Sequence, residues 1–292
     1  MINQTFVQVS EYLKEHGVKN HNFMLRQIHD GVDDIDIFNP NITDEEKKIV
    51  RCEIQENVWY FLRTVVRIPH HGNLSKFIAN IQNVSMIYCA EKGSNVYVQT
   101  PRGTFSSGSI STYMMWLILT GRTNVWQVDE NRDSPYTRAV RIISGLPEWI
   151  SDEFLCVTVN RQVSSQCDYN EVKSPFLLKN KKPPYEDLLI VDDFEYTKHC
   201  FDLIVKDKHS PFLVSSTVGP DTEESLRIRD YRNKINLFTL DMFDLDKLPS
   251  LVRIKFKYQE IAECGQLMDI EELRSVISDP IVAMREIDVM DV

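Results

Sequence analysis

The chain has 292 residues, 42% of them apolar and 26% charged, a composition typical of a globular protein whose core needs no disulfides. Its formal net charge of −10 opposes a protein dominated by nucleic-acid binding. Six scattered cysteines without a CxxC pair indicate a reduced, cytosolic setting and no metal site. Residues 1–17 lack the pattern of a signal peptide, and no apolar run of roughly 18 residues predicts a membrane span.

The N-terminal part of the chain is predicted to be mostly helical. Apolar positions at helical spacing indicate helices over 5–16, 22–29, 43–66 and 74–91, with a loop over 68–73. Thr43 and Glu46 stand at the N-cap and capping-box positions of the third helix. The same helix contains a dense aromatic run of Trp59, Tyr60 and Phe61.

The rest of the chain is predicted to alternate between strands and helices. Strands are expected over 95–99, 124–129, 154–160, 187–192, 211–216 and 251–257, and helices over 108–120, 134–144, 195–206 and 222–238. Such alternation with apolar strands predicts an α/β fold with a mostly parallel sheet flanked by helices, as in P-loop NTPases. We divide the chain into an N-terminal helical segment (1–50) packed on an α/β core (51–262), and an acidic helical tail (263–292).

The segment 96–119 has the layout of a phosphate-binding loop between a strand and a helix. Its turn consists of Arg102, Gly103, Thr104, Phe105, Ser106 and Ser107. A working loop has Gly-Lys-[Ser/Thr] at the helix entrance, where this chain has Phe105, Ser106 and Ser107. A serine cannot supply the positive charge that lysine offers to terminal phosphates. Arg102 is the nearby cation, which either contacts an anion or forms a structural ion pair.

Two further segments end predicted strands with polar residues. Asp192 and Asp193 follow an apolar strand, as a Walker-B strand places a magnesium ligand and a catalytic carboxylate. Ser216 and Thr217 stand at the carboxyl end of the strand over 211–216. Ligands dock at the carboxyl ends of the strands in open α/β sheets, so these residues are predicted to line one pocket with the loop.

Several segments together resemble the ATPase domain of phage terminase large subunits, particularly those of very large "jumbo" phages. The matching segments are Arg51–Glu53 with Asn57–Arg63 and Val66–Pro69, then Pro101–Ser107, Asp192–Tyr196, Ser215–Gly219 and Arg285–Ile287. They occur in the order of the family's adenine-side segment, P-loop, Walker-B strand, coupling motif and domain-closing motif. The resemblance implies a terminase-like fold and a phage origin, with Trp59, Tyr60 and Phe61 on the adenine side of the pocket, as in an active relative. The alternative for this aromatic run is burial in the core.

The departures from the family's motifs affect the chemistry. Gly103, Phe105 and Ser106 replace the family's Gln, Gly and Lys, while Asp193 replaces its catalytic Glu and Val218 its coupling Pro. The chain also ends at Val292, where the family would begin a nuclease domain. Losing electrostatic stabilisation of the transferred phosphoryl group raises the barrier by several kcal/mol. We therefore expect no catalytic residues, cofactor or metal, and a vestigial nucleotide pocket.

Two functions follow as hypotheses. The first is a catalytically inactive terminase-like protein that works as a protein-binding adaptor or scaffold, in DNA packaging, portal or capsid docking, or association with the phage-nucleus shell. It would act in the cytoplasm of an infected bacterium, at the packaging site or that shell, and we expect no nucleic-acid partner because the net charge is negative. The second is a weak or unconventional NTPase that uses Arg102 with Asp192 and Asp193.

The acidic tail is the predicted partner surface. Seven acids face two bases over residues 264–292, which gives a local charge of −5. The candidate contact residues are Asp269, Glu271, Glu272, Asp288 and Asp291. Such a segment would repel DNA and could contact a basic protein partner. The alternative is that it only keeps the chain soluble.

Overall fold

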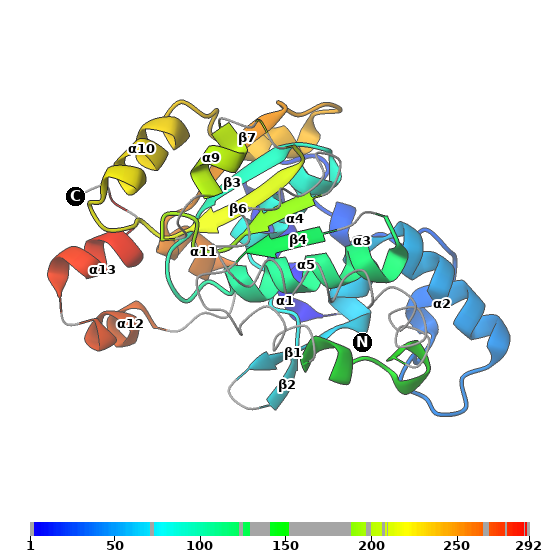
Figure 1. Ribbon diagram of the computed structural model, residues 1–292. Coiled ribbons are helices and arrows are strands. Elements are labelled where there is room, and N and C mark those ends of the chain that lie inside the picture. Colours follow the sequence, from blue (N-terminus) through cyan, green and yellow to red (C-terminus); the bar gives the residue numbers. More distant parts are fainter. Residues whose placement is uncertain are drawn as a thin grey trace.

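The computed structural model describes residues 3–70, 73–122, 125–128, 141–151, 188–196, 200–205, 208, 210–264, 269–277, 279–288 and 290. Within them the chain has an α/β fold with a five-stranded sheet flanked by helices, which confirms the predicted class (Figure 1). The strand order is β4-β5-β6-β3-β7, and every pair is parallel. The strands are β3 (Asn95–Gln99), β4 (Val125–Val128), β5 (Leu188–Val191), β6 (Phe212–Ser216) and β7 (Leu251–Lys255). The predicted strand over 154–160 lies outside the described residues.

The two faces of the sheet are covered by different helices. Alternate side chains of β3 point to opposite faces, so Val96 and Val98 join one apolar cluster and Tyr97 joins another. The first cluster includes side chains of α4 (Ile81–Glu91) and α5 (Ser106–Thr120). The second includes side chains of α9 (Cys200–Val205) and α10 (Glu223–Arg232). Burial on both faces explains why the strands are continuous apolar runs.

The N-terminal helices complete the first apolar cluster. Side chains of α1 (Gln4–Glu15) and α2 (Asp44–Glu56) share that cluster with β3. Thr43 and Glu46 form the expected capping box. The continuous helix expected to residue 66 is wrong, because Asn57 ends α2 and its side chain caps a new turn, α3 (Val58–Tyr60). A π-helical turn (Phe61–Val65) follows, and the helix expected over 22–29 is only a 3-10 turn (Phe23–Leu25).

A short hairpin replaces the loop predicted over 68–73. Strand β1 (Arg67–His70) pairs antiparallel with β2 (Asn73–Lys76). The prediction failed because Pro69 and Gly72 look like breakers in sequence, whereas a hairpin edge tolerates proline. The next helix accordingly begins only at Ile81, after the N-cap Asn80.

The C-terminal part contains β7 and three short helices. These are α11 (Tyr258–Glu263), α12 (Ile270–Val276) and α13 (Pro280–Glu286). Helices α12 and α13 lie beyond the end of the sheet toward which the strand arrows point (Figure 1). A small apolar cluster of Tyr258, Leu273 and Ile287 holds them together. The helix expected over 222–238 ends at Arg232, and the one expected over 134–144 is described only from residue 141.

Among the residues that the structure describes, no helix is long and apolar enough to span a bilayer.

Candidate functional site

A cavity of about 360 Å³ opens where the carboxyl ends of β3, β5 and β6 meet. These three strands are neighbours and parallel, so the loops that follow them converge at one edge of the sheet. Nine of the ten predicted pocket residues line the cavity: Arg102, Gly103, Thr104, Phe105, Ser106, Ser107, Asp192, Asp193 and Thr217. The tenth, Ser216, lies beneath it, where its hydroxyl accepts a hydrogen bond from the backbone N–H of Glu195 at 3.0 Å.

The loop keeps a conformation that normally requires glycine. Phe105 has a φ of 59° and Gly103 a φ of 80°, both in the left-handed region. A non-glycine residue pays steric strain there, and such strain is typical of functional sites. The loop therefore has at Phe105 a backbone conformation that glycine would adopt without strain.

Behind the loop lies a hydroxyl–amide cluster, which consists of Thr100, Thr104, Ser106 and the side-chain amide of Gln82. The Ser106 hydroxyl lies 2.6 Å from the Thr100 hydroxyl and accepts a hydrogen bond from Gln82 Nε2 at 2.8 Å. Thr104 contributes contacts of 2.9 Å to Thr100 and 3.1 Å to Ser106. All four residues are buried. The Ser106 side chain, at the position where a P-loop has its lysine, is thus hydrogen-bonded to neutral groups.

The opposite wall of the cavity is acidic. Asp192 is buried at the end of β5, where it accepts hydrogen bonds from the Ser215 hydroxyl at 2.6 Å and from the Asp193 N–H at 3.2 Å. Asp193 also has a left-handed backbone, with a φ of 53°. Ser107 lines the same cavity, so a hydroxyl and two carboxylates face one space. These oxygen groups suit a magnesium ion better than an unaccompanied phosphate.

Among the lining residues that the structure describes, Arg102 is the one arginine, and none is a lysine. Its guanidinium forms an ion pair with the carboxylate of Glu286 from α13, so it makes a structural ion pair. With Asp192, Asp193 and Glu286 ionised, the described lining residues carry three negative charges and one positive charge, a formal balance of −2. This balance opposes a triphosphate.

The predicted adenine-side residues do not line the cavity. Tyr60 and Phe61 are fully buried in the first apolar cluster. Trp59 packs edge-on against Phe23, with ring centroids 5.1 Å apart. Burial of aromatic area in the core accounts for this run. Glu53, from the same matching segment, binds the backbone N–H groups of residues 28 and 29.

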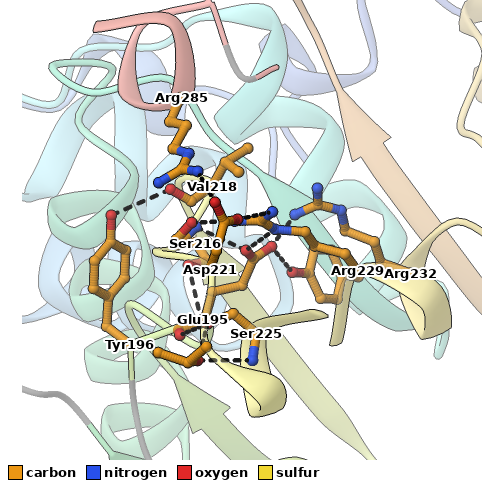
Figure 2. Close-up of polar contacts among 12 residues, drawn as sticks. Glu195, Tyr196, Ser216, Val218, Asp221, Ser225, Arg229, Arg232 and Arg285 are labelled. Carbon is orange, nitrogen blue, oxygen red and sulfur yellow. Dashed lines mark hydrogen bonds and ion pairs between the residues drawn. The ribbon is translucent and has the colours of Figure 1, made fainter. Parts of the chain in front are cut away.

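A buried ionic network, which was not predicted from the sequence, lies next to the cavity (Figure 2). It consists of Glu195, Arg229, Arg232 and Asp221, and we name it the Glu195 network. Glu195 forms ion pairs with both arginines, and Arg232 is fully buried. Arg229 also binds Asp221 at 2.7 Å. Tyr97 on β3 donates to the Glu195 carboxylate at 3.1 Å. Burial lowers the pKa of the Arg232 guanidinium and raises the pKa of the Tyr97 hydroxyl.

The same network joins the loops after β5 and β6. The backbone N–H of Gly219 donates to the Glu195 carboxylate at 2.7 Å, and the Ser225 hydroxyl donates to the Glu195 carbonyl at 2.9 Å. A Cβ added to Gly219 would lie 2.8 Å from Glu195 Cβ, so glycine permits the close approach. Tyr196, in the cavity lining, donates to the Val218 carbonyl at 3.2 Å (Figure 2). Two features of the sequence indicate this network. Glu195 closely follows Asp192 and Asp193, and Arg229 and Arg232 lie three positions apart on α10.

The predicted partner residues of the acidic tail divide into two groups. Asp269 caps α12, and Asp288 pairs with Arg274 at 2.7 Å, so both are engaged within the chain. Glu271 and Glu272 are exposed. Asp291 lies outside the described residues.

The cavity has room for a small ligand between its acidic wall and the loop over 102–107, but among the described lining residues no unpaired arginine or lysine faces a phosphate chain. The described residues contain no cluster of three metal-ligating side chains. Comparison with protein-family models and with curated proteins found no match to this chain.

Proposed function

We propose that this protein is a catalytically inactive, terminase-ATPase-like phage protein that works as a protein-binding adaptor. The observation that carries the proposal is the state of residue 106, where a P-loop has its lysine: Ser106 is buried in the hydroxyl–amide cluster, and the described lining residues have a formal charge balance of −2. Phosphoryl transfer requires positive charge aimed at the transferring group. The loop precedes helix α5, as a phosphate-binding loop precedes its helix. The one described cation of the lining, Arg102, is paired with Glu286.

The adaptor role rests on what the molecule presents besides the cavity. A rigid sheet covered on both faces carries an acidic C-terminal segment in which Glu271 and Glu272 are exposed. Acidic surfaces favour basic protein partners and disfavour DNA. The partners we propose are phage proteins of the portal, the capsid, the terminase or the phage-nucleus shell. The corresponding location is the cytoplasm of the infected bacterium.

The first test is nucleotide binding by the full chain, measured by thermal shift with magnesium and ATP. A ligand at about 100 times its Kd adds roughly 2.7 kcal/mol to the free energy of unfolding. We expect no shift of the melting temperature and no ATP turnover. A shift that depends on magnesium would overturn the proposal.

A gain-of-binding experiment tests the physical reason. The double substitution Phe105→Gly and Ser106→Lys restores the motif, and the matched control Phe105→Gly with Ser106→Met adds similar side-chain length without charge. We expect nucleotide binding in the lysine variant and none in the methionine variant. Binding by neither variant, with both folded, would show that the missing charge is not the reason.

The adaptor role is tested by affinity purification of the tagged chain from infected cells. We expect a portal, capsid, terminase or shell component to copurify, and to be weakened by the double substitution Glu271→Gln and Glu272→Gln. The matched control is Lys234→Gln, which removes an exposed charge just after the end of α10. Recovery of none of these components would contradict the role, and equal recovery in all variants would contradict the acidic surface.

A weak NTPase is the second candidate, and one observation favours it. Ser107 and Asp192 line the same cavity, at the places where P-loop enzymes hold magnesium. Turnover that disappears in the variant Asp192→Asn would support this candidate. The same measurement without turnover in the wild type would remove it.

A further inference from the structure

The two C-terminal helices contact the loop that forms the cavity. We name residues 269–288, which include α12 and α13, the C-terminal strap. The backbone N–H of Arg102 donates to the Glu286 carbonyl at 2.6 Å, and the two side chains form an ion pair. A Cβ on Gly103 would lie 3.6 Å from Leu273 of α12, so α12 packs directly on the loop. The strap therefore covers one rim of the cavity.

A second ion pair fastens the strap to the Glu195 network. Asp221, in the loop after β6, accepts from Arg229 with one carboxylate oxygen and from Arg285 of α13 with the other (Figure 2). One carboxylate thus joins the strap to the buried charges below the cavity. Loss of the Arg285 contact would leave the pair with Arg229 in place.

Apolar contacts add little to this attachment. No residue of α13 is buried, and Ile281 on that helix is 53% exposed. The apolar cluster that holds the strap has three buried members, Tyr258, Leu273 and Ile287. Segments with few buried apolar contacts open at a lower free energy than the core. The strap can therefore open while the sheet stays folded.

We propose that the C-terminal strap is a detachable cover of the cavity, held by the Arg102–Glu286 and Arg285–Asp221 pairs, and that its release exposes the loop over 100–108. The closed strap also places the Glu286 carboxylate on Arg102, the one arginine among the lining residues that the structure describes. Opening the strap frees this guanidinium. The device depends only on contacts within the chain, so it does not rest on the adaptor or the NTPase reading.

Hydrogen–deuterium exchange of the full chain, followed by mass spectrometry, tests the strap. The variants are Arg285→Gln, Glu286→Gln and the double variant. The matched control is Lys234→Gln, because it removes the exposed ion pair between Lys234, which follows α10, and Asp230 on that helix. We expect exchange over 100–108 and 269–288 to rise about two- to fivefold in each single variant and by roughly the product in the double variant. Exchange in α4 and β3 stays unchanged, and the control matches the wild type throughout.

Two results would overturn the proposal. One is unchanged exchange over 100–108 in the double variant, which would show that the two pairs do not hold the cover. The other is an equal rise in α4, which would show that the whole fold loosens instead of the strap. Each single variant removes one ion pair and leaves the other in place. If one of them fails to fold, the exchange rates of the other still test whether an ion pair holds the strap.

Discussion

The hydroxyl–amide cluster and the Glu195 network lie at the same edge of the sheet, yet one is neutral and the other ionic. Ser106, Thr100 and Gln82 exchange short hydrogen bonds without any charge. Glu195 is instead enclosed by Arg229 and Arg232. In a phosphate-binding site, positive charge faces the ligand. Here the buried positive charge lies one layer below the cavity and is matched by carboxylates.

The comparison teaches that the carboxyl edge of the sheet is well supported, although the one described cation of its cavity lining, Arg102, is paired with Glu286. Buried polar clusters favour one arrangement of loops, because breaking their hydrogen bonds is costly in a buried site. The buried Gln82 Oε1 has no hydrogen-bond partner among the described residues, whereas Gln82 Nε2 lies within hydrogen-bond distance of three hydroxyls. Both clusters join segments far apart in sequence: Gln82 reaches Ser106, and Arg232 reaches Glu195. The cavity is thus a stable structural feature, as a docking platform requires.

The largest expected effect comes from removing one arginine of the Glu195 network. Arg232→Met leaves the Glu195 carboxylate buried with one arginine fewer, which we expect to lower the free energy of unfolding by about 3–5 kcal/mol. Urea denaturation measures the loss. The double variant Glu195→Gln with Arg232→Met should lose less than the single variant, because no buried charge is left underpaired. Equal losses would show that packing, not charge, holds this site.

The neutral side should respond less strongly. Ser106→Ala removes a hydroxyl from the cluster, but Gln82 Nε2 keeps its hydrogen bonds to Thr100 and Thr104. We expect a loss of about 1 kcal/mol in the same denaturation assay. A loss as large as that of Arg232→Met would contradict the difference between the clusters.

The strain at Phe105 can be separated from its ring. Phe105→Gly and Phe105→Ala both remove the ring, but only glycine adopts a φ of 59° without a steric penalty. We expect the glycine variant to be more stable than the alanine variant by about 1 kcal/mol. Thermal unfolding of the pair measures this difference. Equal stability would mean that the loop changes conformation in both.

The smallest effect is a pH dependence at the rim of the ionic network. The hydrogen bond from Arg229, joined by Arg285, holds the pKa of Asp221 below its usual 3.8, against a smaller opposing effect of burial. A lowered pKa means that the stabilisation is complete above the unfolded-state pKa and is lost as pH falls through the folded-state value. The difference in melting temperature between wild type and Asp221→Asn should therefore be constant from about pH 7 to about pH 5.

The same difference should shrink toward zero as the pH falls below 3.8. The neutral cluster has no titratable side chain, so Ser106→Ala serves as the control and should differ from wild type equally at each pH. A difference for Asp221→Asn that stays constant at low pH would contradict the shared ion pairs.

Much of the fold could be predicted because strong local patterns specify it. The apolar runs of β3, β5 and β6 were predicted within one or two residues, since strands buried on both faces must be apolar throughout. The cavity followed from the same reasoning, as the carboxyl ends of parallel strands meet at one edge. The hairpin β1–β2 was missed because its pairing is set by contacts between strands, which leave a weak local signal.

Residue types alone determined that Ser106 brings no charge to the loop and that Asp192 ends an apolar strand. Only the tertiary structure decided where charges were neutralised: Arg102 by Glu286, and Glu195 by two arginines of α10. The physical reason is that side-chain type is a local property, whereas an ion pair depends on the distance between groups, which packing sets for residues as far apart in sequence as 102 and 286.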